Sequence, residues 1–192
     1  MDRQREKLIN AVIYFTKNTE HCHKLKLMKL FYYLDFWHFK ETGRSVTGLD
    51  YKAWRDGPVP PSLFYEIEPE NNPADIKEYF FIEYEKFQNS SGQCLRIKTK
   101  NKKKFNSEVF TKRELEILER VAYTFRNAKA QDMTDSTHLS NSPWSKTKNE
   151  KGDSATIDYM LALDNEPNSL LPEDVEERIK LDNETKELLS RL

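Results

Sequence analysis

The stretch that most constrains the fold runs from residue 23 to residue 41, HKLKLMKLFYYLDFWHFKE. At 3.6 residues per turn, its apolar side chains cover two neighbouring faces of one helix, with Leu27 and Phe31 on one face and Tyr32 on the next. A helix that is apolar over so much of its circumference is stable only when other elements surround it. We therefore predict that this helix is the buried hub of a helical core.

The remaining arc of the same helix carries basic and aromatic side chains. Its members are Lys26, Lys29, Tyr33, Trp37 and Lys40. An arc of this composition is either a solvated cover or a contact surface, and aromatic anchors are common in contact surfaces. We treat these five residues as the first candidate for a binding surface.

The overall composition disfavours several classes of protein. The 192 residues include 31 basic and 32 acidic side chains, so the net charge is −1 and a dedicated nucleic-acid binder is not expected. No apolar run reaches the roughly 18 residues of a membrane-spanning helix, and the charged N-terminus does not resemble a signal peptide. The two cysteines form no disulfide framework, so we expect a cytoplasmic protein that does not act at a membrane.

Three residues before the central helix raise the question of a metal site. His21 and His23 are two positions apart, so on a helix they would point in different directions. Cys22 lies between them without the spacing of a zinc motif. The sequence therefore predicts no metal ligand set and no cofactor.

Asp35 lies on the apolar side of the central helix, where an unpaired carboxylate would be costly. We predict that it is paired, either with His38 one turn further on or with Arg55. The alternative is acid–base chemistry by Asp35, His38 and His138, but this requires two histidines that are distant in the sequence to meet. A structural role is therefore preferred.

The rest of the chain predicts a predominantly α-helical α+β fold. Helices are expected over 3–18, from Pro61 to about 67, over 111–127, 129–138 and 154–164, and near the C-terminus after Pro172. Thr111 and Glu114 form a capping box that opens the 111–127 helix. A short strand over 50–55 precedes a rigid turn over 56–61 that contains Gly57 and Pro58, and the charged segment 146–153 is expected to be flexible. We divide the chain into a domain over 1–164 and a linker with an amphipathic helix over 165–192.

A small antiparallel β-hairpin is expected from strands over 78–87 and 93–100, joined by a turn over 89–92. A register that places Glu85 opposite Arg96 and Glu83 opposite Lys98 would pair opposite charges. The lysine-rich run that follows, 98–104, is interpreted as a solvated strand end, with phosphate binding as the alternative.

Several stretches together resemble one family. They are KLMKLFY at 26–32, TGR at 42–44 and YKAWRDGPVP at 51–60, followed by the capping box at Thr111, Thr137-His138 and Pro143-Trp144. In this order they are similar to the Panacea domain, the SocA-like antitoxin domain that is also called the phage-associated GepA-like family. The resemblance extends from about residue 5 to residue 163.

The resemblance implies a compact, mainly helical domain without catalytic residues. It implies an antitoxin that binds and neutralises a cognate protein toxin, and SocA-type members also deliver their toxin to the ClpXP protease. The arc of Lys26, Lys29, Tyr33, Trp37 and Lys40 then becomes the candidate toxin-binding surface. We expect structural roles for the motif residues Tyr32, Asp35, His38, Trp54, Gly57, Pro58, His138 and Trp144.

Two other functions stay open at this point. One is a DNA-binding transcriptional autoregulator, which would use the basic edge at Lys102–Lys104. The other is an enzyme built on the Asp35, His38 and His138 cluster, which we do not expect. A ClpXP-type protease and a second copy of the chain, forming a homodimer, are further partners to consider.

Overall fold

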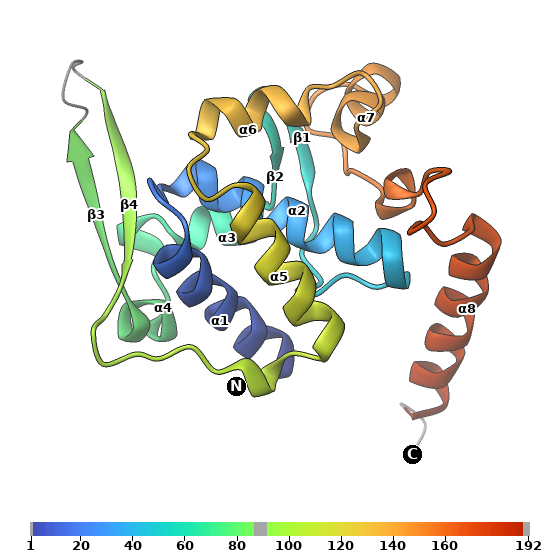
Figure 1. The fold of residues 1–192 in the computed structure, drawn as a ribbon, viewed down its shortest axis with the longest axis horizontal. Coiled ribbons are helices and arrows are strands. Elements are labelled where there is room, and N and C mark those ends of the chain that lie inside the picture. The colour runs from blue at the N-terminus through green and yellow to red at the C-terminus, as the bar shows by residue number, and fades with distance from the viewer. Residues whose placement is uncertain (1, 87–91, 190–192) are drawn as a thin grey trace.

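The computed structural model of the chain describes residues 2–86 and 92–189 (Figure 1). Within these residues the fold is predominantly helical α+β, with two small antiparallel sheets, as the sequence predicts. The helices are α1 (Arg3–Asn18), α2 (Lys24–Thr42), α3 (Pro61–Glu66), α4 (Ala74–Tyr79), α5 (Lys112–Thr124), α6 (Ala130–Thr137), α7 (Pro143–Lys151) and α8 (Pro172–Leu189). Short 3-10 turns cover Pro69–Asn71, Ser107–Val109 and Tyr159–Ala162.

Helix α2 is the hub of the core, and it contacts α1, α3, α5, α6 and both sheets. The side chains of Leu27, Leu30, Phe31 and Leu34 are fully buried. Helices α1 and α5 pack against it and against each other in the middle of the molecule (Figure 1). The predicted capping box is present, because the Thr111 side chain accepts from the Glu114 amide and Glu114 accepts from the Thr111 amide.

The first sheet is a tight pair of strands, β1 (Lys52–Trp54) and β2 (Gly57–Val59). A third segment extends its edge, because the Ala53 amide donates to Ala155 and the Ile157 amide donates to Tyr51, both at 2.9 Å. The predicted helix over 154–164 is therefore wrong. Its first residues give their backbone hydrogen bonds to β1, and only the 3-10 turn Tyr159–Ala162 remains helical.

The second sheet is the predicted hairpin, formed by β3 (Phe80–Lys86) and β4 (Gln93–Thr99). Its register differs from the prediction, because Glu85 lies opposite Cys94 and Glu83 lies opposite Arg96. The expected ion pairs still form, but diagonally: Arg96 Nη1 lies 2.7 Å from Glu85 Oε1, and Lys98 Nζ lies 2.6 Å from Glu83 Oε1. Long side chains reach a diagonal neighbour, so charge pairing alone does not fix a register. The predicted turn over 89–92 lies almost wholly outside the described residues.

Two helices were not predicted from the sequence. Helix α4 occupies 74–79, so β3 begins later than predicted. Helix α7 covers most of the charged segment 146–153, because Pro143 stands in its first turn and the Ser142 side chain accepts from the Ser145 amide. A good N-terminal cap therefore outweighs the polar composition of this segment.

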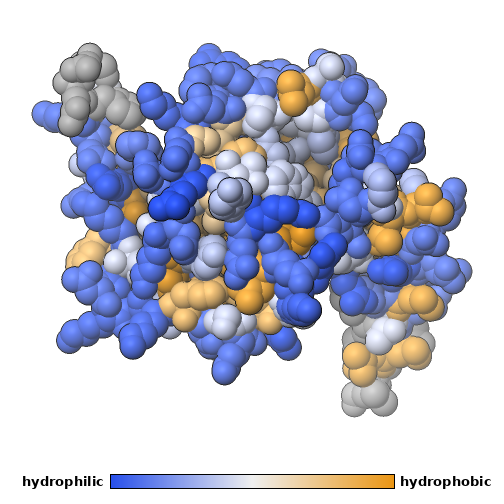
Figure 2. Space-filling view, viewed as in Figure 1, coloured by the Kyte–Doolittle hydropathy of each residue, from blue (hydrophilic) through white to orange (hydrophobic). Residues whose placement is uncertain are grey.

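Helix α8 stands at one side of the molecule (Figure 1). Val175 is fully buried near Gly43, and Arg178 donates to the Thr42 carbonyl at 3.0 Å. Other apolar side chains of α8, including Leu181 and Leu188, are exposed, and Figure 2 shows orange patches over this helix. The proposed division of the chain near residue 164 stays a prediction.

The described part of the chain contains no helix with the length and apolar character needed to cross a bilayer.

Candidate functional site

The predicted contact arc on α2 is not an exposed surface, and this part of the sequence interpretation is corrected. Lys26 is 0% exposed and Lys29 is 2% exposed. Both side chains run inward along the helix and place their ammonium groups against backbone carbonyls. The helical-wheel argument failed because it assumed that lysine marks a solvated face, whereas a lysine with enough acceptors can be buried.

Lys26 joins two turns that are distant in the sequence. Its Nζ donates to the carbonyl oxygens of Glu20 at 2.6 Å, Arg126 at 3.1 Å and Ala128 at 2.7 Å. The first acceptor belongs to the connection between α1 and α2, and the other two to the connection between α5 and α6. All three donors of one ammonium group are thereby used to hold two loops together.

Lys29 holds the turn between β1 and β2. Its Nζ donates to the carbonyl oxygens of Asp56 at 2.6 Å and Pro58 at 3.2 Å. Burial lowers the pKa of Lys29 from 10.5 to about 7, although the nearby Asp56 carboxylate opposes this shift. Gly57 has a φ of 106°, and a Cβ there would collide with the Lys29 ammonium. The glycine is therefore required both by the backbone conformation and by the lysine.

Asp35 is fully buried and paired, but with neither of the predicted partners. Its Oδ1 accepts from the amides of Val46 at 2.9 Å and Thr47 at 2.8 Å, and its Oδ2 accepts from the hydroxyls of Thr47 at 2.5 Å and Tyr51 at 2.7 Å. Burial raises the pKa of Asp35, and these donors oppose the shift. The carboxylate fixes the chain that leaves α2, which is a structural role.

The other residues of the arc, Tyr33, Trp37 and Lys40, are half-buried and already engaged. The Tyr33 hydroxyl lies 2.6 Å from Ser136 Oγ, and its ring stacks on Phe125 at 4.5 Å between centroids. Lys40 donates to Asp164 at 2.6 Å. These residues border a small cavity of about 180 Å³. Only this part of the predicted arc reaches the surface.

The remaining motif residues support the fold around the first sheet. The Trp144 indole donates to the Trp54 carbonyl at 2.9 Å, and the His138 ring stacks on Trp144 at 3.9 Å. His38 lies 2.6 Å from the Arg44 carbonyl through Nδ1, and Tyr32 is buried beside Phe36. The described residues show no interaction that joins Asp35, His38 and His138 into one cluster.

A second groove lies at the opposite end of α2 and was not predicted. It has a volume of about 730 Å³ and is formed by the first turn of α2, α3, the β3–β4 hairpin and the start of α6. Its lining includes the large apolar side chains of Leu25, Phe64, Tyr84 and Leu95. Leu25 is 49% exposed and Tyr84 is 54% exposed, so both present apolar surface that a partner can cover.

Charged groups inside this groove are partly neutralised. Lys24 forms an ion pair with Glu68, and its ammonium also lies 3.3 Å from the centroid of the Phe64 ring. Burial lowers the pKa of Lys24, and Glu68 opposes this shift. His21 and Lys129 lie at the rim. The groove therefore offers an apolar floor with a weakly basic edge.

The lysine-rich run after β4 is largely occupied by partners within the chain. Lys98 pairs with Glu83, Lys103 pairs with Glu78, and Lys100 donates to the Lys77 carbonyl at 2.5 Å. These contacts reduce the positive charge that a phosphate backbone would meet. Lys102 and Lys104 of the same run are exposed, so the DNA-binding alternative stays a prediction.

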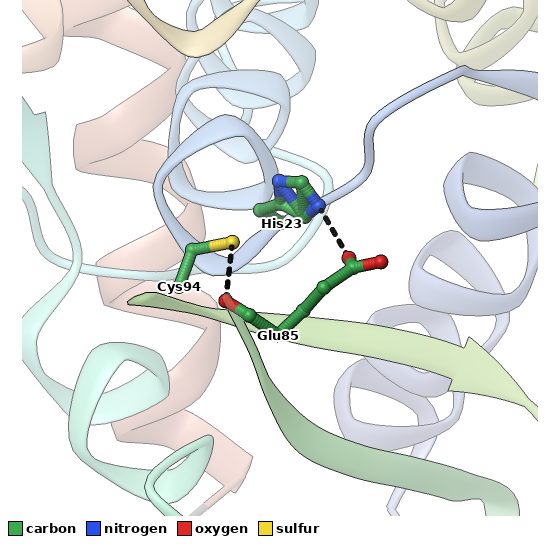
Figure 3. Close-up of side chains that lie close together, drawn as sticks. All are labelled: His23, Glu85 and Cys94. Atoms are coloured by element: carbon green, nitrogen blue, oxygen red, sulfur yellow. Dashed lines mark hydrogen bonds and ion pairs between the residues drawn. The ribbon is translucent and has the colours of Figure 1, made fainter. Parts of the chain in front are cut away.

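One group of potential metal ligands lies at the edge of the groove. His23, Glu85 and Cys94 each offer one ligand atom, and these atoms lie within 4.8 Å of one another (Figure 3). Cys22 is buried in the core, and His21 is exposed at the rim. The structure therefore selects only His23 from the three neighbouring residues that the sequence raised.

The fold and the groove define a small helical α+β domain with an apolar groove at one end of its central helix. The chain belongs to the family of SocA-like antitoxins with a Panacea domain, whose family model matches residues 27–145. That match includes the central helix from Leu27 onward, the Trp54–Gly57 turn and the hairpin strands. No curated protein and no solved structure matches the chain.

Proposed function

We propose that this protein is an antitoxin that binds and neutralises a cognate protein toxin in the cytoplasm, without enzymatic activity of its own. The membership of the Panacea family carries this proposal. The groove at the start of α2 supports it, because its volume of about 730 Å³ accommodates several side chains of a partner. A toxin therefore inserts an apolar segment between α2, α3 and the hairpin.

Leu25 and Tyr84 are the anchors of this interface. Both are large side chains whose exposed surface faces the same groove. Burial of apolar surface against a partner is the main favourable term in protein association, and tyrosine is over-represented among the residues that dominate it. The half-buried surface of Tyr33, Trp37 and Lys40 is the second candidate, since a cavity of about 180 Å³ lies beside it.

The test is rescue of growth when this chain is co-expressed with the product of the adjoining reading frame. Leu25→Glu and Tyr84→Ala should abolish rescue and capture of the toxin, while the melting temperature stays unchanged. Tyr123→Ala is the matched control, because Tyr123 is 83% exposed and lies outside the groove. If Trp37→Ala abolishes rescue and the groove variants do not, the toxin binds the second surface instead.

Delivery of the bound toxin to a ClpXP-type protease is a further proposal based on family likeness. It predicts that the half-life of the toxin shortens when this chain is present and lengthens in a host without ClpX. An unchanged half-life together with full rescue would leave sequestration as the whole mechanism.

A further inference from the structure

Three side chains with different donor atoms meet where the start of α2 touches the hairpin. His23 is the N-cap of α2, Glu85 lies on β3, and Cys94 lies directly opposite Glu85 on β4. Figure 3 shows the three side chains directed toward a common space. Glu85 Oε2 lies 3.2 Å from His23 Nε2, and the Cys94 thiol lies 3.7 Å from the Glu85 carbonyl oxygen.

The backbone holds these residues in place before any ligand arrives. Glu85 and Cys94 are a cross-strand pair, so their side chains project from the same face of the hairpin. His23 forms an isolated antiparallel bridge with Arg96, which attaches the first turn of α2 to β4. The three positions are therefore fixed relative to one another by backbone hydrogen bonds, with only side-chain rotation left free.

The donor set suits a zinc ion. An imidazole nitrogen, a thiolate and a carboxylate oxygen are all ligands of zinc, with distances of about 2.0–2.3 Å. Tetrahedral ligands at those distances lie roughly 3.5 Å apart, and the three atoms here are within 4.8 Å. Small side-chain rotations close that difference. Calcium and magnesium are poor candidates, because they prefer oxygen ligands alone.

A neighbour of the three side chains also orients one of the ligand atoms. Arg96 holds the other carboxylate oxygen, Glu85 Oε1, at 2.7 Å, and so leaves Oε2 directed toward His23. Partners that orient a ligand in this way are a regular feature of metal sites.

We propose that His23, Glu85 and Cys94 form a binding site for one zinc ion, with a fourth position open to water. Binding releases the thiol proton of Cys94 to solvent, so a thiolate and a carboxylate balance the charge of the ion. The ion joins the start of α2 to the hairpin at the edge of the groove. This proposal is independent of toxin binding, because it concerns the isolated chain.

The test uses the purified full chain, treated with a chelator and kept reduced with a reagent that contains no thiol. Titration with Co²⁺ should give one ion per chain and a thiolate-to-cobalt charge-transfer band, and Zn²⁺ should remove that band. Cys94→Ser should abolish the band, and His23→Gln and Glu85→Gln should weaken Co²⁺ binding by about tenfold or more. Zn²⁺ should also raise the melting temperature of the original chain but not of Cys94→Ser.

Two variants serve as matched controls. Cys22→Ser removes the other cysteine, which is buried in the core, and Glu83→Gln removes a carboxylate from the same strand. Neither should change Co²⁺ binding. The proposal is overturned if the original chain binds no Co²⁺ in a defined ratio, if the band persists in Cys94→Ser, or if Cys22→Ser abolishes it.

Discussion

The ammonium group of Lys29 lies 2.6 Å from the carbonyl oxygen of Asp56, at the turn between the two strands of the first sheet. This contact joins the central helix to the turn before the GPVP segment, and both stretches are among those that carry the family resemblance. Because the lysine is buried, the contact is part of the core and not of a binding surface. It therefore links two of the family's sequence motifs within one folded unit.

The first prediction concerns the pH dependence that Lys29 gives to stability. Its pKa is about 7 in the folded chain and returns to 10.5 on unfolding. When the pH lies between these two values, unfolding therefore takes up a proton. The free energy of unfolding should therefore rise with pH across this window, by up to about 1.4 kcal/mol per pH unit. Chemical denaturation of the original chain and of Lys29→Met at several pH values measures the difference.

In Lys29→Met the pH dependence that Lys29 causes should disappear. The free energies of unfolding of the original chain and of Lys29→Met should therefore diverge as the pH rises. Lys102→Met is the control, because Lys102 is exposed and its removal should leave the slope unchanged. Parallel profiles for Lys29→Met and the original chain would show that Lys29 keeps its charge in the folded state.

The second prediction concerns Gly57. Gly57→Ala forces a side chain into a positive φ and against the Lys29 ammonium, so it should cost about 3 kcal/mol or more. Gly152→Ala has a similar φ of 85°, but nothing lies within 4 Å of its Cβ, so only the backbone strain of about 1–3 kcal/mol applies. Urea denaturation of both variants compares them. If the two variants lose the same free energy of unfolding, the Lys29 side chain moves away from the new Cβ at no cost.

The third prediction concerns the buried carboxylate of Asp35. Asp35→Ala leaves the Tyr51 hydroxyl and two backbone amides without an acceptor, and should cost about 3 kcal/mol or more. A double-mutant cycle with Tyr51→Phe should give a coupling free energy of about 1–2 kcal/mol. Additive losses would show that the hydrogen bond between these two side chains contributes little.

The fourth prediction concerns the C-terminal segment. A chain that ends at residue 164 loses the buried Val175 and the ion pair between Arg44 and Asp182, whose side chains are largely exposed. The loss should be about 1–3 kcal/mol, mostly from Val175. Thermal melting and circular dichroism should show a folded domain. An unfolded product would place the domain boundary further toward the C-terminus.

Local sequence patterns predicted many of the elements correctly. The apolar pattern of α2, the capping box of α5 and the alternation of the hairpin each reflect interactions within a few residues. The prediction failed where a distant partner decided the outcome. Residues 155–157 are extended because this segment exchanges backbone hydrogen bonds with Tyr51 and Ala53, which are about a hundred residues away in the sequence.

The same distinction applies to the candidate sites. The sequence by itself determined that α2 is surrounded by other elements, because its apolar faces leave no alternative. Only the tertiary structure decided that Lys26 and Lys29 point inward, since their acceptors are carbonyls of other loops. It also decided that His23 meets Glu85, 62 residues further along the chain. Arguments from residue spacing compare side chains that are close in the sequence. Metal ligands and hydrogen-bond partners need only be close in space, so those arguments miss contacts between distant parts of the chain.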